Sequence, residues 1–402
     1  MEILLLLGLS LLLGYIGSII SGRFKLPGVV GYIIIGLLLG PSFLDIFNPH
    51  LLEEMDMISD IALSLVAFTI GSEMRADVLK RQGAGLAAII FLESFCAFFL
   101  VMFLVYLLTH KWYVALLFGA MAPASAPAGT VAVLQEYKAK GPLTSTLLSV
   151  VGLDDGLAII IYGFAAALAK KLIGSADEIN IQSFLMGPAS EIIKSLLLGA
   201  AIGAAFSYFA RRIRSQNDVL ITSLGAIFLC AGLSNMWHLS IILTNLTLGL
   251  VMANMYLHGA RKSADAIQYI TPPIFVLFFV LAGSHLQIQL LPAMGMLGIL
   301  YIIGRTAGLL GGAYIGATIG KAEKNVRNYL GLGILSQAGV AIGLALIVVK
   351  EFSELGPEGH QVATLIINTI AATTIIFEII GPITTKIAIE KAGEIGKLEK
   401  YN

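Results

Sequence analysis

Charged side chains are scarce in this sequence. Asp, Glu, Lys and Arg make up 12% of its 402 residues, while hydrophobic residues make up 57%. An ordinary soluble domain contains about 25% charged residues. The scarcity therefore excludes an ordinary soluble domain and predicts a polytopic membrane protein. Because the long apolar runs show no alternation with a period of two, we expect an all-α fold and not a β-barrel.

An excess of charge of either sign is also lacking, as are catalytic motifs. The 25 basic and 25 acidic residues cancel, which excludes a basic surface for nucleic acid. The two cysteines, Cys96 and Cys230, lie in apolar runs, which is typical of packing residues and not of a disulfide or a metal site. No nucleophile–base set or metal motif is present, so we expect neither an enzyme nor a cofactor.

Apolar segments of about 17–25 residues are long enough to cross a bilayer. The sequence predicts about 13 transmembrane helices, the first of which lacks the basic region of a cleaved signal. They cover residues 2–21, 27–41, 57–73, 84–109, 112–136, 142–168, 184–210, 218–236, 239–256, 270–286, 291–318, 326–349 and 361–386.

Basic residues are distributed unevenly over the predicted loops. If the N-terminus is outside, the inside loops and the C-terminal tail hold 19 Lys and Arg residues. The outside loops then hold four, namely Lys111, Lys170, Lys171 and Lys350. This bias follows the positive-inside rule. We therefore expect a multi-pass protein of the cell (inner) membrane with its N-terminus outside and its C-terminus cytoplasmic.

Short patterns recur 212 residues later in the chain. The segment FTIGSEM, residues 68–74, matches VLAGSHL, residues 280–286, and the same offset carries Glu93 onto Arg305. It also carries PASAPAG onto LSQAGVA, residues 335–341. The recurrence indicates that the first six spans are repeated as the last six.

A single linking span between two six-helix repeats inverts the second repeat in the membrane. We predict repeats at about 1–170 and about 216–388, joined by a linker helix at about 184–212. Inverted repeats are typical of secondary transporters.

Two spans in corresponding positions are interrupted. Pro123 and Pro127 lie within the span 112–136, and proline breaks a helix by removing a backbone hydrogen bond. The corresponding span 326–349 contains several glycines and the polar residues Ser336 and Gln337. Paired interruptions point to the binding site of a transporter, where half-helix termini expose carbonyls and dipole ends. The alternative is a pair of kinked helices with a packing role only.

Hydroxyl and amide side chains lie near both interruptions. We expect Ser125, Thr130 and Gln337 to orient a cation or its water, although these residue types alone are not specific.

Asp154 and Asp155 are the only charges between Leu143 and Ala169. A carboxylate in the middle of a bilayer costs roughly 3 kcal/mol or more unless it is neutralised or hydrated. Neighbours on a helix point about 100° apart, so we expect one carboxylate to face a wet cavity and the other a neighbouring helix. Arg305, the one arginine in the middle of a span, is the expected partner of the second. A carboxylate that holds either H⁺ or a small cation provides the chemistry of an antiporter; the alternative is a structural ion pair.

Glu93 and Glu378 are the other acids in the middle of predicted spans. Glu378 is expected to face inward, and Glu93 either pairs near Arg305 or lies at an interface between protomers. For both residues, structural support and direct ion handling stay open.

The segments KLPGVVGYIIIGLLLGP, VAFTIGSEM, VVGLDDGLAI, LSQAGVAIGLAL and FEIIGP resemble the monovalent cation:proton antiporter-2 family. This family includes sodium/proton antiporters of the NapA type and potassium/proton antiporters of the Kef type. The resemblance implies the NhaA-like antiporter fold, with a pair of crossed broken helices. It also implies that Asp155 is the carboxylate that binds Na⁺ and the proton, and that Asp154 partners Arg305.

The sequence departs from the pattern of the family that it resembles in two respects. Sodium-transporting members with the Asp-Asp pair often have lysine where this chain has Arg305. Arginine stays charged, so it cannot release a proton, and this argues against exchange of two protons per cation. The sequence also contains no Gly-rich dinucleotide fingerprint, and we expect no soluble regulatory domain, which argues against the Kef type.

The resemblance further implies a homodimer surrounded by membrane lipids. The core domain is expected around the broken spans 112–136 and 326–349, and the dimerisation domain around spans 1–41 and 218–256.

The expected function is exchange of Na⁺ (or Li⁺) for H⁺ by alternating access, in the service of pH homeostasis. Exchange of K⁺ for H⁺ is an alternative in the same family. A sodium-coupled symporter of organic anions is an alternative from another class, although the adjacent aspartates disfavour an anionic substrate. A channel or a membrane receptor is disfavoured by the repeat and by the acids in the membrane.

Overall fold

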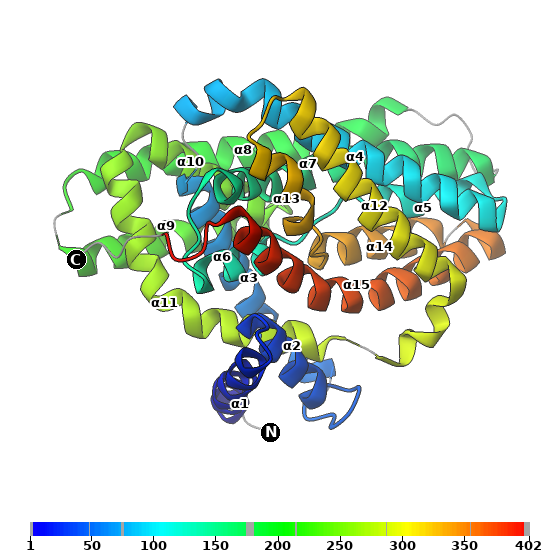
Figure 1. The fold of residues 1–402 in the computed structure, drawn as a ribbon, viewed down its shortest axis with the longest axis horizontal. Helices are drawn as coiled ribbons and strands as arrows, with labels where there is room; N and C mark the ends of the chain where they lie inside the picture. The colour runs from blue at the N-terminus through cyan, green and yellow to red at the C-terminus, as the bar shows by residue number, and fades with distance from the viewer. Residues whose placement is uncertain are drawn as a thin grey trace. The chain divides into compact units, whose positions relative to one another are not determined.

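The computed structural model describes residues 3–47, 49–73, 76–173, 181–213, 215–286, 288–353 and 355–397. Over these ranges the chain is helical and contains no β-strand (Figure 1). Polar backbone groups have no water to bond to in the interior of a bilayer, and a helix satisfies them within one segment.

The helices follow one another with short connections. Their bounds are α1 Ile3–Arg23, α2 Gly28–Leu39, α3 Pro49–Glu73, α4 Ala76–Thr109, α5 Trp112–Met121, α6 Pro127–Glu136, α7 Pro142–Ile173, α8 Ile181–Ala210, α9 Gln216–Met236, α10 Ile241–Met255, α11 Leu257–Ser284, α12 Gly295–Ile319, α13 Lys324–Gly333, α14 Gly339–Phe352 and α15 Gly356–Ala392. Two short 3₁₀ turns, Ile288–Leu290 and Pro292–Met294, precede α12.

Eight of the described helices are long and apolar enough to cross a membrane, and five shorter apolar helices accompany them. The chain is therefore a multi-pass membrane protein, and the number of thirteen spans stays a prediction. The sequence interpretation was wrong about the starts of several helices, and α3 and α4 each begin eight residues before the expected span. Helix α11 begins at Leu257, well before the expected start at residue 270, because the polar residues Arg261, Lys262 and Asp265 continue the helix beyond the apolar run.

The described helices form two compact units. The first contains Met1–Gly83 and Ala189–His285. In it, α3 packs against α10 and α2 packs against α11. Both crossings depend on glycine: a Cβ at Gly71 would lie 1.9 Å from the backbone oxygen of Leu246, and one at Gly283 would lie 2.2 Å from that of Ile33. Small residues allow such close approach of membrane helices.

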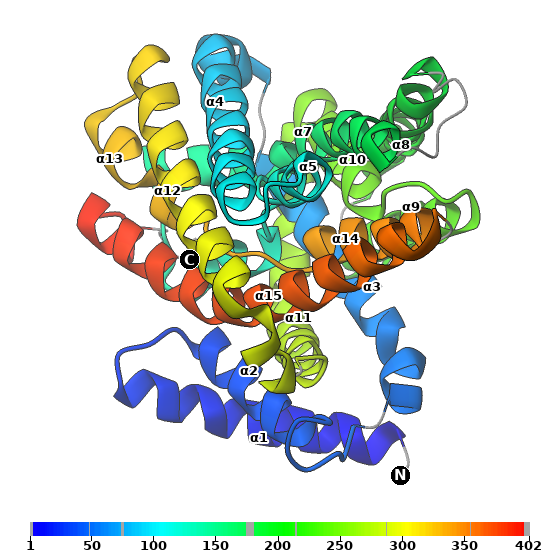
Figure 2. The same cartoon turned by 90° about the vertical axis from the view of Figure 1, so that its right-hand side faces the viewer.

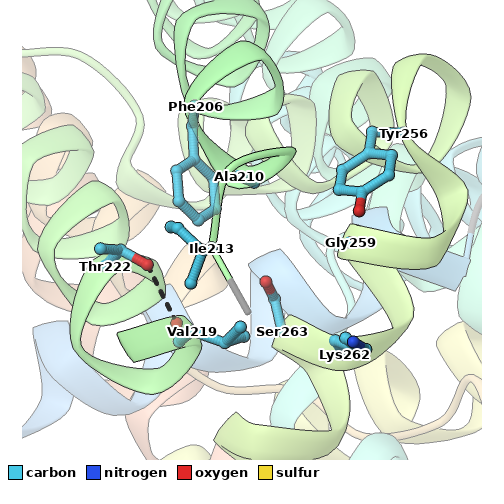
Figure 3. Close-up of a pocket in the computed structure, with 9 residues that line it drawn as sticks. All are labelled: Phe206, Ala210, Ile213, Val219, Thr222, Tyr256, Gly259, Lys262 and Ser263. Atoms are coloured by element: carbon cyan, nitrogen blue, oxygen red, sulfur yellow. Dashed lines mark hydrogen bonds between the residues drawn. The ribbon is translucent and has the colours of Figure 1, made fainter. Parts of the chain in front are cut away.

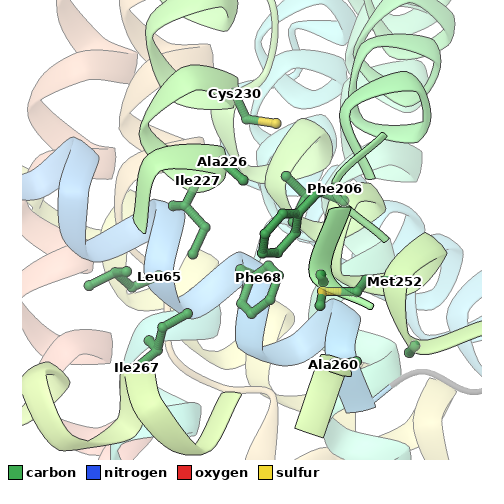
Figure 4. Close-up of a cluster of buried hydrophobic side chains, with 12 residues drawn as sticks. Leu65, Phe68, Phe206, Ala226, Ile227, Cys230, Met252, Ala260 and Ile267 are labelled. Atoms are coloured by element: carbon green, nitrogen blue, oxygen red, sulfur yellow. The ribbon is translucent and has the colours of Figure 1, made fainter. Parts of the chain in front are cut away.

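A cluster of buried apolar side chains holds the first unit together (Figure 4). Phe68 of α3, Phe206 of α8, Ile227 of α9 and Met252 of α10 meet in this cluster. The same unit contains a small cavity of about 10 Å³ between α8, α9 and α11, lined by Phe206 and Ser263 among others (Figure 3). This volume accommodates about one water molecule, and none of the predicted site residues lines it.

The second unit contains Ala84–Pro188 and Leu286–Asn402. In it, α5 packs against α7, α13 against α15, and α6 against α15. Helix α4 lies beside α12 (Figure 2), where a row of glycines on α12 faces the backbone of α4. A Cβ at Gly308 would lie 2.5 Å from the Cα of Ala97, and one at Gly312 would lie 2.5 Å from the Cα of Glu93.

Both interrupted helices lie in the second unit. Helices α5 and α6 are separated by residues 122–126, and α13 and α14 by residues 334–338. The two interruptions are 212 residues apart at both ends, and the half-helices before them have the same length. The sequence offset therefore also relates the helix boundaries.

We predict that Gly312→Ala lowers the midpoint of thermal unfolding of the purified protein in detergent. The new methyl group would collide with the backbone of α4, and overpacking typically costs about 1–3 kcal/mol. Gly311→Ala is the matched control, because a Cβ there meets nothing within 4 Å. Equal midpoints for the two variants would contradict the close packing of α4 against α12.

Candidate functional site

Two prolines interrupt the first broken helix. Helix α5 ends at Met121, and Pro123 follows two residues later, where its missing N–H and its ring oppose a further helical turn. Pro127 occupies the first turn of α6, a position at which proline is well tolerated. The local sequence thus ends one half-helix and begins the next.

The second interruption contains no proline, and contacts with the first stabilise it. The backbone N–H of Ala126 donates to the carbonyl of Ser336 at 3.0 Å. The hydroxyl of Thr130 donates to the carbonyl of Gly333, the last residue of α13, at 2.8 Å. The two interrupted helices therefore cross at these segments, as predicted.

Arg305 of α12 lies fully buried at this crossing. Its guanidinium donates to backbone carbonyls of both interruptions, and each has two acceptors. They are Ala122 at 3.0 Å, Ala124 at 2.9 Å, Leu335 at 2.7 Å and Ser336 at 3.2 Å. The end of a helix leaves carbonyls without partners and carries partial negative charge. Arg305 satisfies these carbonyls and offsets that charge at two helix ends at once.

The predicted ion pair between Asp154 and Arg305 is absent from the contacts of the described residues. Within the described residues the hydrogen bonds of Arg305 go to carbonyls, and Asp154 accepts instead from the hydroxyl of Ser125 at 2.5 Å. The two groups interact only through longer-range electrostatics. The prediction was wrong because it assigned the guanidinium to the most obvious acid and overlooked the carbonyls that two broken helices expose.

Three further side chains support the crossing. The amide of Gln337 donates to the carbonyl of Met121 at 3.2 Å and to the hydroxyl of Tyr301 at 2.7 Å. The ring of Phe377 lies 4.3 Å from the guanidinium of Arg305, a cation–π contact. Gln337 was predicted to belong to the site, whereas Tyr301 and Phe377 were not. Tyr301 stands one helical turn before Arg305, a spacing that places both on one face of α12.

Asp154 and Asp155 of α7 are both buried, with 0% and 5% of their surface exposed. The second oxygen of Asp154 has no hydrogen-bond partner among the described residues, and the same holds for both oxygens of Asp155. The carboxyl group of Asp155 lies near the backbone N–H of Ser125 without a hydrogen bond of normal geometry. Asp155 is thus a buried acid that nothing described in the chain neutralises.

Glu93 of α4 is fully buried and close enough to Asp154 and Arg305 for electrostatic interaction. One of its oxygens accepts from the hydroxyl of Ser94 at 2.8 Å, and the other has no partner within the described residues. The structure therefore places Glu93 in the neighbourhood of Arg305, without a direct hydrogen bond.

Glu378 of α15 is 8% exposed, and no hydrogen bond or ion pair among the described residues joins it to the aspartates or to Arg305. One turn later, Gly381 lies against Ser336, where a Cβ would come within 2.2 Å of the Ser336 hydroxyl. That hydroxyl and one oxygen of Glu378 have no hydrogen-bond partner in the described parts of the chain. Ser336 thus belongs to the crossing, and Glu378 lies one helical turn from the glycine that packs against it.

The described residues contain no cluster of three His, Cys, Asp or Glu side chains that could hold a metal ion. A cation bound here would take its ligands from one or two carboxylates together with hydroxyl and carbonyl oxygens. Such oxygen sites suit hard cations and not the softer transition metals.

Comparison with known proteins gives consistent matches along the chain. A family model described as "Sodium/hydrogen exchanger, transmembrane" matches residues 8–391. The Na⁺/H⁺ antiporter of Enterococcus hirae is 26% identical over 390 residues, covering 93% of this chain and 96% of that protein. The K⁺/H⁺ antiporter subunit KhtU of Bacillus subtilis is 22% identical, covering 94% and 92%.

Solved structures show the same fold. The sodium proton antiporter MjNhaP1 from Methanocaldococcus jannaschii, seen by electron microscopy, matches with a TM-score of 0.76 at 19% identity, covering 98% of this chain and 97% of that one. The predicted all-α antiporter fold and the resemblance to sodium/proton antiporters are thereby confirmed.

We predict that Arg305→Gln strongly lowers the unfolding temperature in detergent. The variant leaves buried carbonyls without a donor, and each such unsatisfied group typically costs about 1–3 kcal/mol. Arg305→Lys keeps the charge but has only three donors, so it should fall between the wild type and the glutamine variant. Arg212→Gln is the control, because Arg212 is exposed and bonds to the hydroxyl of Tyr208. A glutamine variant at 305 that melts like the control would refute the role of Arg305 at the helix ends.

Proposed function

The chain belongs to the sodium/hydrogen exchanger family, and from this premise we propose that Asp155 is the group that carries ions in exchange of Na⁺ or Li⁺ for H⁺. Asp154 and Ser125 assist it at the crossing of the broken helices. Arg305, Glu93 and the polar residues at the crossing support the site without carrying ions.

The observation that carries this proposal is the state of the Asp155 carboxyl group. It is buried in the second unit, and neither oxygen has a hydrogen-bond partner among the described residues. A buried charge without a partner is costly, and either a proton or a bound cation removes that cost. Asp155 can therefore be occupied by one or the other but not left empty and charged.

The arrangement of Arg305 makes this competition possible. Its guanidinium is held by four carbonyls, so it does not neutralise either aspartate directly. A guanidinium also stays protonated at physiological pH, so it takes no part in proton transfer. The negative charge at Asp155 is left for the transported ion.

Asp154 and Ser125 fix the geometry around the carrier. The 2.5 Å hydrogen bond from the Ser125 hydroxyl holds one oxygen of Asp154 against the segment between α5 and α6. The other oxygen of Asp154 has no hydrogen-bond partner among the described residues, and Asp154 directly precedes Asp155 in the chain. A dehydrated cation at Asp155 needs several oxygen ligands, and this oxygen together with hydroxyl and carbonyl groups of the interruptions can supply them.

The choice between Na⁺ and K⁺ depends on the size and rigidity of this oxygen site. Sodium is favoured by the matched family and by the Enterococcus relative, while the Bacillus relative named as a K⁺/H⁺ antiporter subunit keeps potassium as the alternative. A sodium-coupled organic-anion symporter would need a cationic group free to bind its substrate. The buried arginine at the crossing is already occupied by carbonyls.

For the assembly, we propose a homodimer with the N-terminus outside and the C-terminus cytoplasmic. The unit that contains the interrupted helices would be the transporting core, and the unit that contains α1, α2, α9 and α10 would form the dimer contact. The supporting observations are the separate packing of the two units and the uneven distribution of basic residues.

We predict that Asp155→Asn abolishes exchange while the protein still folds. Asparagine has nearly the same shape but cannot carry the negative charge. The measurement is proton flux in proteoliposomes, followed with a pH-sensitive dye after pulses of Na⁺, Li⁺ or K⁺. Wild-type protein should respond to Na⁺ and Li⁺.

Asp218→Asn is the matched control, because Asp218 is an exposed residue in the first turn of α9. It should transport like the wild type. Exchange at the wild-type rate by the Asp155 variant would refute the role of Asp155 as the carrier. A response of the wild-type protein to K⁺ alone would support cation/proton exchange but show that K⁺ and not Na⁺ is the substrate.

We predict that the Na⁺ concentration at half-maximal rate rises as the pH falls. Protons and Na⁺ compete for one carboxylate, so each tenfold increase in proton concentration requires up to about tenfold more Na⁺. The check is a series of Na⁺ titrations of flux over several pH values, with Vmax at saturating Na⁺ as the reference. A half-saturating concentration that is independent of pH would contradict competition at a single site.

A further inference from the structure

The chain makes a tight turn directly after α15, here called the C-terminal turn, Gly393–Gly396. Gly393 has a φ of 68°, a left-handed conformation that favours glycine. The N–H of Gly393 donates to the carbonyl of Glu390, and that of Glu394 donates to the carbonyl of Ile389. This pattern is a Schellman motif, which ends a helix and redirects the chain. It turns Glu394 back into the interior of the second unit, where this residue is only 2% exposed.

The carboxylate of Glu394 caps the N-terminus of α7. One oxygen accepts from the N–H of Leu143 at 2.8 Å, and the other accepts from the N–H of Thr144 at 2.7 Å and from its hydroxyl at 2.6 Å. Helix α7 has no cap of its own, because Gly141 before it has no side chain and Pro142 has no N–H. A residue about 250 positions later therefore satisfies the first free donors of the helix.

The C-terminal turn also holds neighbouring helix ends. The N–H of Lys140 donates to the carbonyl of Glu394 at 3.0 Å, and the N–H of Gly396 donates to the carbonyl of Tyr137, which follows α6, at 2.9 Å. At the start of α13, the amide of Asn325 donates to the carbonyl of Ala392 at 3.1 Å. The turn thus fastens the ends of α6, α7 and α13 to α15.

These four helices carry most of the candidate site. Helix α7 carries both aspartates, α6 carries Thr130, α13 ends at the carbonyl that accepts from Thr130, and α15 carries the ring beneath Arg305. The fastening lies at one end of the helices, and the site lies within them.

We propose that Glu394 is a positioning residue for Asp155, which rests on the proposed role of Asp155 as the carrier. Asp155 stands eleven residues after Thr144, about three helical turns or roughly 16 Å along α7. A helix of this length is stiff, so the place where its first turn is held determines where the carboxyl group lies. A carboxylate suits this role, because a charged acceptor at a helix N-terminus forms strong hydrogen bonds to backbone N–H groups.

The test compares Glu394→Ala and Glu394→Gln with Glu390→Gln in the flux assay. Glu390 is exposed and lies four residues earlier in the same segment, so it controls for the loss of a charge. We expect the alanine variant to raise the half-saturating Na⁺ concentration at least threefold, with a smaller change in Vmax. Glutamine offers a single acceptor oxygen and should fall between alanine and the wild type. The Glu390 variant should match the wild type.

Gly141→Ala tests the same contact from the other side. A Cβ at Gly141 would lie 2.3 Å from the carboxyl carbon of Glu394 and would displace it. This variant should also raise the half-saturating Na⁺ concentration. Combining it with Glu394→Ala should add little, because both changes remove the same cap.

Hydrogen–deuterium exchange supplies a readout that does not require transport. In Glu394→Ala, peptides that cover the first half of α7, up to and including Asp155, should exchange at least threefold faster than in the wild type. Peptides of α9 should be unchanged. Wild-type exchange rates in α7, or a lower unfolding temperature with an unchanged half-saturating Na⁺ concentration, would overturn the positioning role. Absence of any flux in the wild type would instead refute the proposed function, and the exchange rates would still decide whether Glu394 holds α7.

Discussion

The site depends on the need to satisfy carbonyls at two helix ends inside an apolar unit. Helices α5 and α13 both end where they cross, and each end leaves carbonyls without intrahelical partners. Arg305 resolves this with one planar group that bonds to two carbonyls of each interruption, and Gln337 and Thr130 bond to the last residues of α5 and α13. The positive charge is matched by two negative dipole ends and not by an acid. As a result, the guanidinium bonds to neither aspartate, and both oxygens of Asp155 are left without a hydrogen-bond partner among the described residues.

Local chemistry explains which parts of this arrangement the sequence predicts. Pro123 and Pro127 predict the first interruption, because proline acts on its own backbone whatever surrounds it. The second interruption has no proline, and its prediction rested on its 212-residue relation to the first, on the glycines and polar residues of its span, and on the resemblance. The partner of Arg305 could not be predicted in this way, since the carbonyls that it binds are exposed only after both helices have broken and crossed. A pairing rule based on charge therefore chose Asp154, which binds Ser125.

Other parts are invisible to hydropathy and to local pattern. The start of α11 was predicted too late, because the first residue of an apolar run marks where the chain enters the apolar part of the membrane. The helix itself begins earlier, in polar sequence. Tyr301 and Phe377 read as ordinary apolar residues until α12 and α15 bring them to Gln337 and Arg305. Glu394 lies in a polar tail, and the helix that it caps begins about 250 residues earlier. The one sign of it in the sequence is the lack of a local cap, because neither Gly141 nor Pro142 at the start of α7 has a side chain that could accept from the first N–H groups.

A common offset of 212 residues is what duplication and fusion of an ancestral half would leave in a chain. The bounds of the two interruptions follow this offset, but the side chains at corresponding positions differ. The offset places Ile366 and Ile367 where the first half has Asp154 and Asp155, and it places the base Arg305 where the first half has the acid Glu93. The first half carries the two adjacent buried acids, and the second half carries the base that bonds to both interruptions. The two halves therefore contribute different groups, and the candidate site requires residues from both.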